Sequence, residues 1–315
     1  LSQLAPSGET LPLDAAWAMM LPVRPGAMPA VEFLVNVAAP TTVRAELRVS
    51  SQPDNHTPDV TLATQEIKLS TGTRIKLPLK FNATIDVPRY AFVCLMANPD
   101  VSVHLSDQRV TGLLAVTQKF NRAVAKSPRQ EPPPGSGIDS FEFWIPQRRP
   151  AGKNLAVKID PPLQVFTVKN LVNGFARPTN QANAWVADFA QEQPVISLTW
   201  DQPQTIARIE LCFDTDFDHP MESVLMGHPE RVMPFCVRDV VVALPANVPV
   251  PAGGSARNGF AKSDTERLLF EISENHQSRQ VIRLGHPVTT DCLELRLLAP
   301  SVNIPVALFA VRCYP

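Results

Sequence analysis

"TRIKLPLKF", residues 73–81, places its four large apolar side chains at every second position and its basic side chains between them. Successive side chains of a β-strand point to opposite faces of the sheet, whereas an α-helix repeats every 3.6 residues. The alternation therefore predicts a β-strand with one buried face and one face toward water.

Short runs with a similar strand-like composition continue along the chain, separated by Pro, Asn, Asp or Gly, and amphipathic helical periodicity is hard to find. In the first half the runs cover 30–39, 41–50, 60–69, 89–97 and 101–106. In the second half they cover 194–200, 205–214, 237–245, 267–273, 279–285, 291–300 and 306–314. Many short strands with turn residues between them predict an all-β fold of antiparallel β-sandwiches.

The length of 315 residues suggests two domains, each able to bury its own core. The proline-rich segment 129–139 reads as a long internal loop, because the strand-like runs 140–146 and 153–160 follow it and would complete the first sandwich. We therefore predict one β-sandwich over 1–162 and a second over 163–315. The chain begins at Leu1 rather than Met, which indicates a processed product or a piece of a longer chain.

Composition excludes several classes of function. The net charge is −1, so no basic field attracts nucleic acid, and no apolar run is long enough for a spanning helix. Neither the glycine-rich nucleotide signatures nor the GxSxG and HExxH motifs occur. The five cysteines have apolar neighbours and no metal-type spacing, which favours buried free thiols, with one disulfide as the alternative.

The densest polar stretch is "CFDTDFDHPMESVLMGHPERVMPFC", residues 212–236. Asp214, Asp216 and Asp218 alternate and would point the same way on a strand, where a cation would offset their repulsion. Oxygen ligands suit Ca²⁺, although the glycine and glutamate of an EF-hand loop are missing. The alternatives are an ordered loop shaped by His-Pro pairs and a metal-dependent enzyme that also uses His219 and His228.

The same stretch also has the composition of a docking surface, since apolar residues there are mixed with charged ones. The predicted partner-docking residues are Met221, Leu225, Met226, Glu230 and Arg231.

A second polar cluster lies in "NLVNGFARPTNQANAWVADF", residues 170–189. Sugar recognition uses an aromatic face together with amide, guanidinium or carboxylate groups that bind hydroxyls. Two alternatives stay open: Trp185 is a platform for a ligand, or it plugs one end of the sandwich core. The predicted ligand-binding residues are Arg177, Asn183, Trp185, Asp188, His219 and His228.

Residues 163–315 resemble the discoidin, or galactose-binding-like, β-sandwich. The likeness is carried by "NLVNGFARPTNQANAWVAD" (170–188), "PVISLTWDQPQTIARIELCFD" (194–214) and "DCLELRLLAP…VALFAVRCY" (291–314). The resemblance implies a non-catalytic module that binds carbohydrate through the loops at one end.

A second resemblance extends over most of the chain. "GIDSFEFWIPQRRPAGKNLAVKIDPPL" (137–163), "NGFARPTNQANAWVAD" (173–188), "FDTDFDHPMESVLMGHPERVMPFCV" (213–237) and "NHQSRQ" (275–280) are similar to the C-terminal region of bacterial FAD-dependent oxidoreductases. Those chains carry a flavin domain before their β-sandwich modules, and no such domain is present here. The resemblance implies that FAD belongs to an associated domain or subunit, on which this chain docks and whose substrate entrance it shapes.

Overall fold

The structure is a computed structural model that describes residues 1–52, 56–118, 129–137, 141–142, 144, 152–215, 235–245 and 267–315. The chain divides into two compact units. Unit 1 comprises Leu1–Val165 and Pro178–Ala182, and unit 2 comprises Phe166–Arg177 and Asn183–Pro315. No helix within the described ranges has the length and apolar character that a membrane crossing requires.

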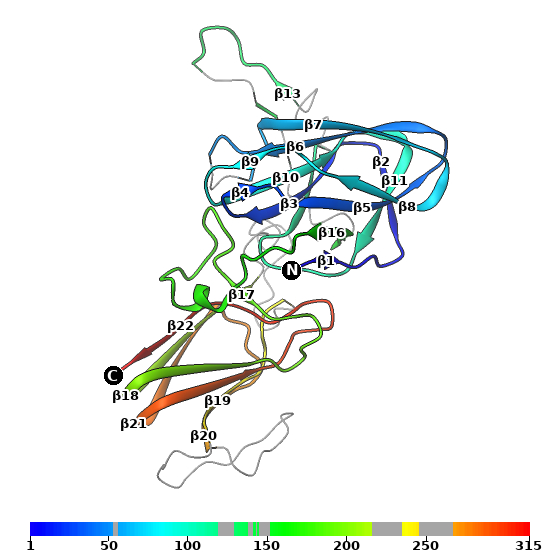
Figure 1. Ribbon diagram of the computed structural model, residues 1–315. Coiled ribbons are helices and arrows are strands. Elements are labelled where there is room, and N and C mark those ends of the chain that lie inside the picture. Colours follow the sequence, from blue (N-terminus) through cyan, green and yellow to red (C-terminus); the bar gives the residue numbers. More distant parts are fainter. Residues whose placement is uncertain are drawn as a thin grey trace. The chain divides into compact units, whose positions relative to one another are not determined.

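Unit 1 is built from short strands that form two large antiparallel sheets (Figure 1). In chain order the strands are β1 Gln3–Leu4, β2 Thr10–Leu13, β3 Trp17–Val23, β4 Gly26–Ala27, β5 Ala30–Val37, β6 Thr41–Val49, β7 Val60–Leu69, β8 Gly72–Leu79, β9 Thr84–Ile85, β10 Arg89–Leu95, β11 Asn98–Ser106, β12 Leu114–Thr117, β13 Arg129–Gln130, β14 Phe141–Glu142, β15 Asn154–Leu155 and β16 Val157–Asp160. The seven-stranded sheet has the order β1-β16-β5-β11-β15, with β2 on β11 and β8 on β5. The five-stranded sheet has the order β12-β3-β10-β6-β7.

The two large sheets of unit 1 differ in how their faces are buried. In β8, Leu77 and Leu79 are buried while Lys76 is exposed, which confirms the predicted one-sided strand. By contrast, β3 and β10 are buried on both faces, and on one of these faces their side chains form an apolar cluster with those of β12 and Trp144. This double burial explains why β3 lacks apolar-polar alternation and was not among the predicted runs.

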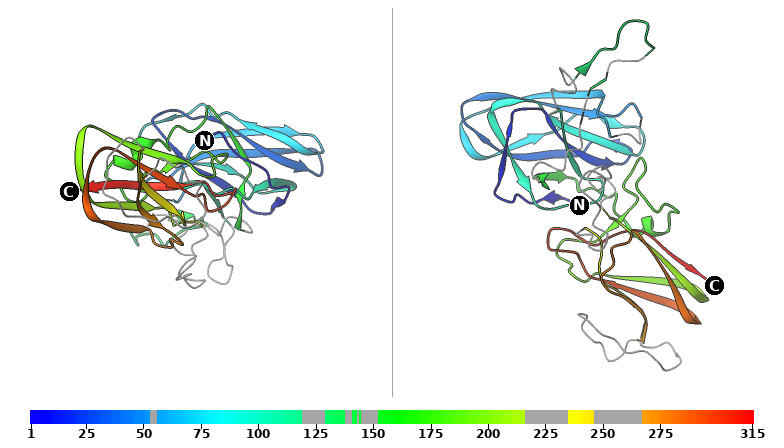
Figure 2. Two further views of the ribbon diagram at one scale, coloured as in Figure 1. Left: turned by 90° about the horizontal axis from the view of Figure 1, so that it is seen from below. Right: turned by 180° about the vertical axis from the view of Figure 1, so that it is seen from behind.

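Unit 2 contains a single six-stranded antiparallel sheet with the order β17-β22-β18-β21-β19-β20. Its elements are the 3₁₀ turn η1 Val168–Val172, β17 Trp185–Val186, β18 Val195–Phe213, β19 Val240–Leu244, β20 Arg267–Ile272, β21 Arg279–Leu297 and β22 Ala307–Tyr314. Figure 2 shows β18 in green, β21 in orange and β22 in red side by side, in agreement with their pairing.

The long strands β18 and β21 each unite two runs that the sequence separates. Pro203 and Pro287 fall inside them, at two points where the pairing register shifts. A proline lacks a backbone N–H, so it is tolerated in a strand at such bulges, which also bend the strand. The expectation of a turn at each proline was wrong, because the ladder resumes on the far side.

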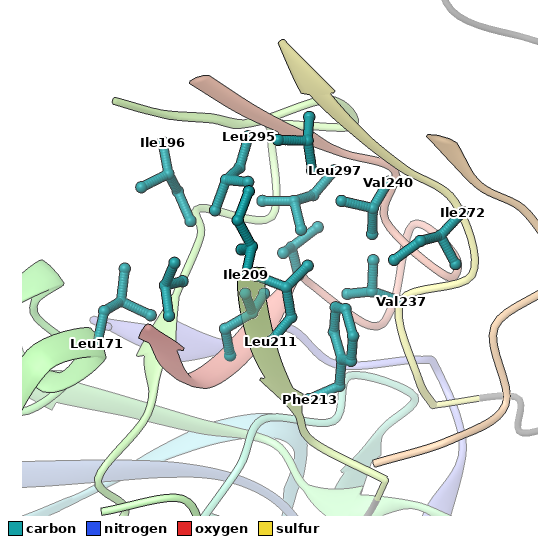
Figure 3. Close-up of a cluster of buried hydrophobic side chains, with 14 of the residues drawn as sticks. Leu171, Ile196, Ile209, Leu211, Phe213, Val237, Val240, Ile272, Leu295 and Leu297 are labelled. Atoms are coloured by element: carbon teal, nitrogen blue, oxygen red, sulfur yellow. The ribbon is translucent and has the colours of Figure 1, made fainter. Parts of the chain in front are cut away.

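The larger of two buried apolar clusters in the described part of unit 2 forms its main core. The second half of β18 contributes Ile209, Leu211 and Phe213 to this cluster (Figure 3). The start of β18 contributes Ile196, and the end of β21 contributes Leu295. The bent sheet therefore encloses its own apolar face. Burying each large apolar side chain in this way stabilises the folded state by roughly 1.5–3 kcal/mol.

The prediction of an all-β fold made of antiparallel sheets is confirmed, since every strand pairing among the described residues is antiparallel. The predicted boundary at residue 162 and the observed division differ mainly in Pro178–Ala182, which belongs to unit 1. All five cysteines lie in the described ranges and are free thiols.

Candidate functional site

Unit 2 presents exposed apolar side chains on the segment that precedes its first strand. Val168 and Val172 lie on η1, and Phe175 is the third residue after that turn. The ring of Phe175 is 45% exposed, although phenylalanine is a residue that proteins usually bury. We call residues 168–177 the aromatic loop.

Hydrogen bonds fix the backbone of the aromatic loop around Phe175. The Asn173 side-chain oxygen accepts the Phe175 backbone N–H at 2.9 Å, which forms an Asx turn. Gly174 lies between them at φ +91°, a conformation that side-chain-bearing residues rarely adopt. Its carbonyl accepts a hydrogen bond from Nη2 of Arg312 on β22, at 3.2 Å. The sheet and the turn therefore fix the backbone that carries Phe175 before any ligand arrives.

Asn183, a predicted ligand-binding residue, is buried and serves this loop. It has a positive φ of 53°, which asparagine tolerates better than most residues. Its Nδ2 donates to the Arg177 carbonyl oxygen at 3.2 Å, and its Oδ1 accepts from Asn173 at 3.5 Å. Asn183 thus ties the middle of the loop to its last residue and has little surface to offer a ligand.

Trp185 lies in the core of unit 2, with 9% of its surface exposed. Of the two sequence-based alternatives, its burial favours the plug over the ligand platform. Arg177 and Asp188 are exposed. The Asp188 carboxylate accepts a hydrogen bond from the backbone N–H of Ala190 at 2.9 Å, so part of its hydrogen-bonding capacity is used to close a turn.

Phe175 is the aromatic residue that the sequence-based prediction missed. It lies within the predicted cluster 170–189, where the prediction named Trp185 as the aromatic residue. The available signal was its position between Gly174 and Ala176, in a polar segment without alternating apolar neighbours. A tryptophan is the more frequent sugar platform, yet the structure exposes the phenylalanine and buries the tryptophan.

Next to the aromatic loop, the face of the sheet opposite the main core carries an unusual number of arginines. Residues directly opposite one another on β22, β18 and β21 form three rows across this face. From the loop outward the rows are Ala310–Cys212–Arg279, Arg312–Glu210–Val281 and Tyr314–Arg208–Arg283. We call Arg208, Arg279, Arg283 and Arg312 the arginine face.

Glu210 lies at the centre of the arginine face, and its side chain is only 4% exposed. Arg279 donates to both carboxylate oxygens, at 2.9 and 2.8 Å, and Arg312 donates to one at 3.3 Å. The hydrogen bonds from Arg279 lower the pKa of Glu210, and the charges of Arg279, Arg312 and Arg208 lower it further, while burial opposes them. Glu210 is therefore a carboxylate at neutral pH and orders the guanidinium groups around it.

Most of the 212–236 stretch lies outside the described residues, including Asp216, Asp218, His219, His228 and the docking residues Met221, Leu225, Met226, Glu230 and Arg231. Asp214 is described and buried at the end of β18. Within the described ranges, no three His, Cys, Asp or Glu side chains are grouped as a metal site. The calcium, metal-enzyme and docking hypotheses for this stretch stay predictions.

The chain is similar to several solved carbohydrate-binding modules. A family 32 carbohydrate-binding module from Streptococcus pneumoniae EndoD matches at 13% identity and TM-score 0.34, covering 49% of this chain and 88% of that one. Chitosan-binding module 1 from a Paenibacillus sp. IK-5 chitosanase/glucanase matches at 9% identity and TM-score 0.32, covering 48% and 87%. XRCC1 bound to the DNA polymerase β catalytic domain also matches, at 14% identity and TM-score 0.30, covering 48% and 88%.

No protein-family model and no curated protein matches the chain. At TM-scores this low, the likeness to solved structures assigns neither a family nor a ligand.

Proposed function

We propose that unit 2 is a carbohydrate-binding module and that the aromatic loop is its binding site. The observation that carries the proposal is the exposed Phe175, whose backbone the Asx turn and Arg312 hold in place. An apolar ring face packs against the C–H face of a sugar, and rigidity before binding lowers the entropy that association costs.

Polar groups beside the ring supply the second half of sugar recognition. The exposed guanidinium of Arg177 lies two positions after Phe175 in the sequence, and Arg312 reaches the loop from β22. Each guanidinium offers planar N–H donors that match the oxygens of neighbouring hydroxyls. Function commonly resides on loops that a rigid scaffold positions, and here the scaffold is the six-stranded sheet.

The proposal is tested with the full chain on an array of plant and bacterial polysaccharides, followed by calorimetry with the polymer that binds. Phe175→Ala should weaken binding about tenfold, the usual scale for losing an aromatic contact at the centre of an interface. Phe270→Ala is the matched control, because that ring is 39% exposed in the same unit but lies on β20, at the other end of the strand order.

The control should bind as the unchanged protein does. If calorimetry detects no binding to any polysaccharide, or if the two variants lose the same affinity, the aromatic loop is not a binding site.

The association with a flavin-dependent oxidoreductase rests on the sequence resemblance, and its docking residues lie in the 212–236 stretch. Under this proposal the chain would deliver or hold a sugar-containing substrate near the flavin domain. Co-purification of the chain with a polypeptide that carries FAD tests the association. A partner-free chain isolated from its natural source would contradict it.

A further inference from the structure

We propose that the arginine face gives unit 2 a preference for acidic polysaccharides, in which sugar carboxylates bind the guanidinium groups. The inference rests on the proposed carbohydrate function and adds the chemical class of the ligand. It starts from an imbalance of charge: the three rows of this face hold four arginines and one glutamate, so positive charge is in excess.

The pair Arg208 and Arg283 is the clearest sign that the face is not arranged for stability alone. The two residues lie directly opposite one another on β18 and β21. Like charges in that position destabilise a sheet. Among the described residues, no carboxylate forms an ion pair with either of them. Local arrangements that cost stability are expected where a protein binds something.

Contacts hold three of the four guanidinium groups, those of Arg208, Arg279 and Arg312, and leave donors for a ligand. The Arg208 guanidinium lies 4.0 Å from the centre of the Tyr314 ring, a cation–π contact that restrains it. Arg279 uses Nε and Nη2 on Glu210, and its side chain is still 61% exposed. Arginine has five N–H donors in a planar fork, so groups remain for a carboxylate, which this fork binds through two parallel hydrogen bonds.

A similar cluster in unit 1 has fewer exposed guanidinium groups. There Glu46 is flanked by Arg44 and Arg48 on β6, and the Arg48 guanidinium lies over the Trp144 ring. Arg48 is almost fully buried in that cluster, whereas Arg44 is 55% exposed. In unit 2 both Arg279 and Arg283 are exposed, so two guanidinium groups rather than one are open to a ligand in solution.

The extent of the arginine face favours a short acidic glycan over a nucleic acid. Three strands span about 10 Å, and the positions from 208 to 212 span about 13 Å. Proteins that bind DNA neutralise roughly 6–10 phosphates over a wider field. The adjoining aromatic loop, which Arg312 joins to this face, adds an apolar contact suited to a sugar ring.

The test compares polygalacturonate with neutral galactan, measured by calorimetry on the full chain. The unchanged protein should bind polygalacturonate at least about tenfold more tightly, and added salt should reduce that preference. Arg283→Gln should remove most of the preference without lowering the melting temperature, because the side chain is exposed. Arg24→Gln, which removes an exposed charge from unit 1, is the control and should leave the preference intact.

The outcomes separate this inference from the proposed function. If both polymers bind equally and only Phe175→Ala weakens them, the aromatic loop stands and the acidic preference is overturned. If Arg283→Gln lowers polygalacturonate binding while Phe175→Ala changes nothing, the arginine face is supported as the binding site and the aromatic loop is not. Tighter binding to a DNA duplex than to polygalacturonate, or equal effects of Arg283→Gln and Arg24→Gln, would overturn the inference.

Discussion

Phe213 and Phe175 belong to the same unit, and the structure predicts opposite consequences when each is replaced by alanine. Phe213 is 0% exposed and lies at the end of β18 in the main core, whereas Phe175 is 45% exposed. Removing a buried phenylalanine ring costs about 3–5 kcal/mol, since the apolar surface is lost and a cavity remains. A surface substitution away from such packing changes stability by about 0.5 kcal/mol or less.

Thermal unfolding followed by circular dichroism and calorimetry measures the difference. For a domain of this size, 1 kcal/mol shifts the melting temperature by about 2–4 °C, so Phe213→Ala should lower that of unit 2 by roughly 6–20 °C. Phe175→Ala should shift it by about 2 °C or less. Similar shifts for the two variants would refute the placement of one ring in the core and the other on the surface.

Two further outcomes follow from the titrating groups of unit 2. Because Arg279 lowers the pKa of Glu210 below its ordinary value of 4.5, this carboxylate stabilises the fold above pH 4.5, and the contribution is lost as the pH falls through the lowered pKa. Glu210→Gln should therefore lower the free energy of unfolding by about 1–2 kcal/mol at pH 7, a figure reduced to allow for the exposure of Arg279. The variant should also lose less stability than the unchanged protein as the pH falls. Urea unfolding measured at several pH values checks this, and an unchanged acid profile would contradict it. Burial raises the pKa of the Cys236 thiol to about 12. Iodoacetamide at pH 8 should therefore modify the half-buried Cys292 at least about tenfold faster than Cys236, as measured by mass spectrometry of digested samples. Equal rates for the two thiols would contradict the burial of Cys236.

Much of the fold was readable from the sequence because a half-buried strand repeats with a period of two. The run 60–69 coincides with β7, and 41–50 differs from β6 by one residue. Prediction failed where that signal is absent. The strand β3 is buried on both faces, and the prolines within β18 and β21 mark bulges rather than turns. Neither property is visible without the neighbouring strands.

The sequence by itself determined the all-β class, and it predicted two successive domains and a cluster of ligand-type residues in the segment 170–189. Only the tertiary structure decided which side chains of that segment face water, burying Trp185 and Asn183 and exposing Phe175. It also brought Arg208, Arg279, Arg283 and Arg312 to one face, although they come from three strands spread over more than one hundred positions. The physical reason is that exposure and charge clustering depend on the strand order and register of the sheet, which pair residues far apart in the chain.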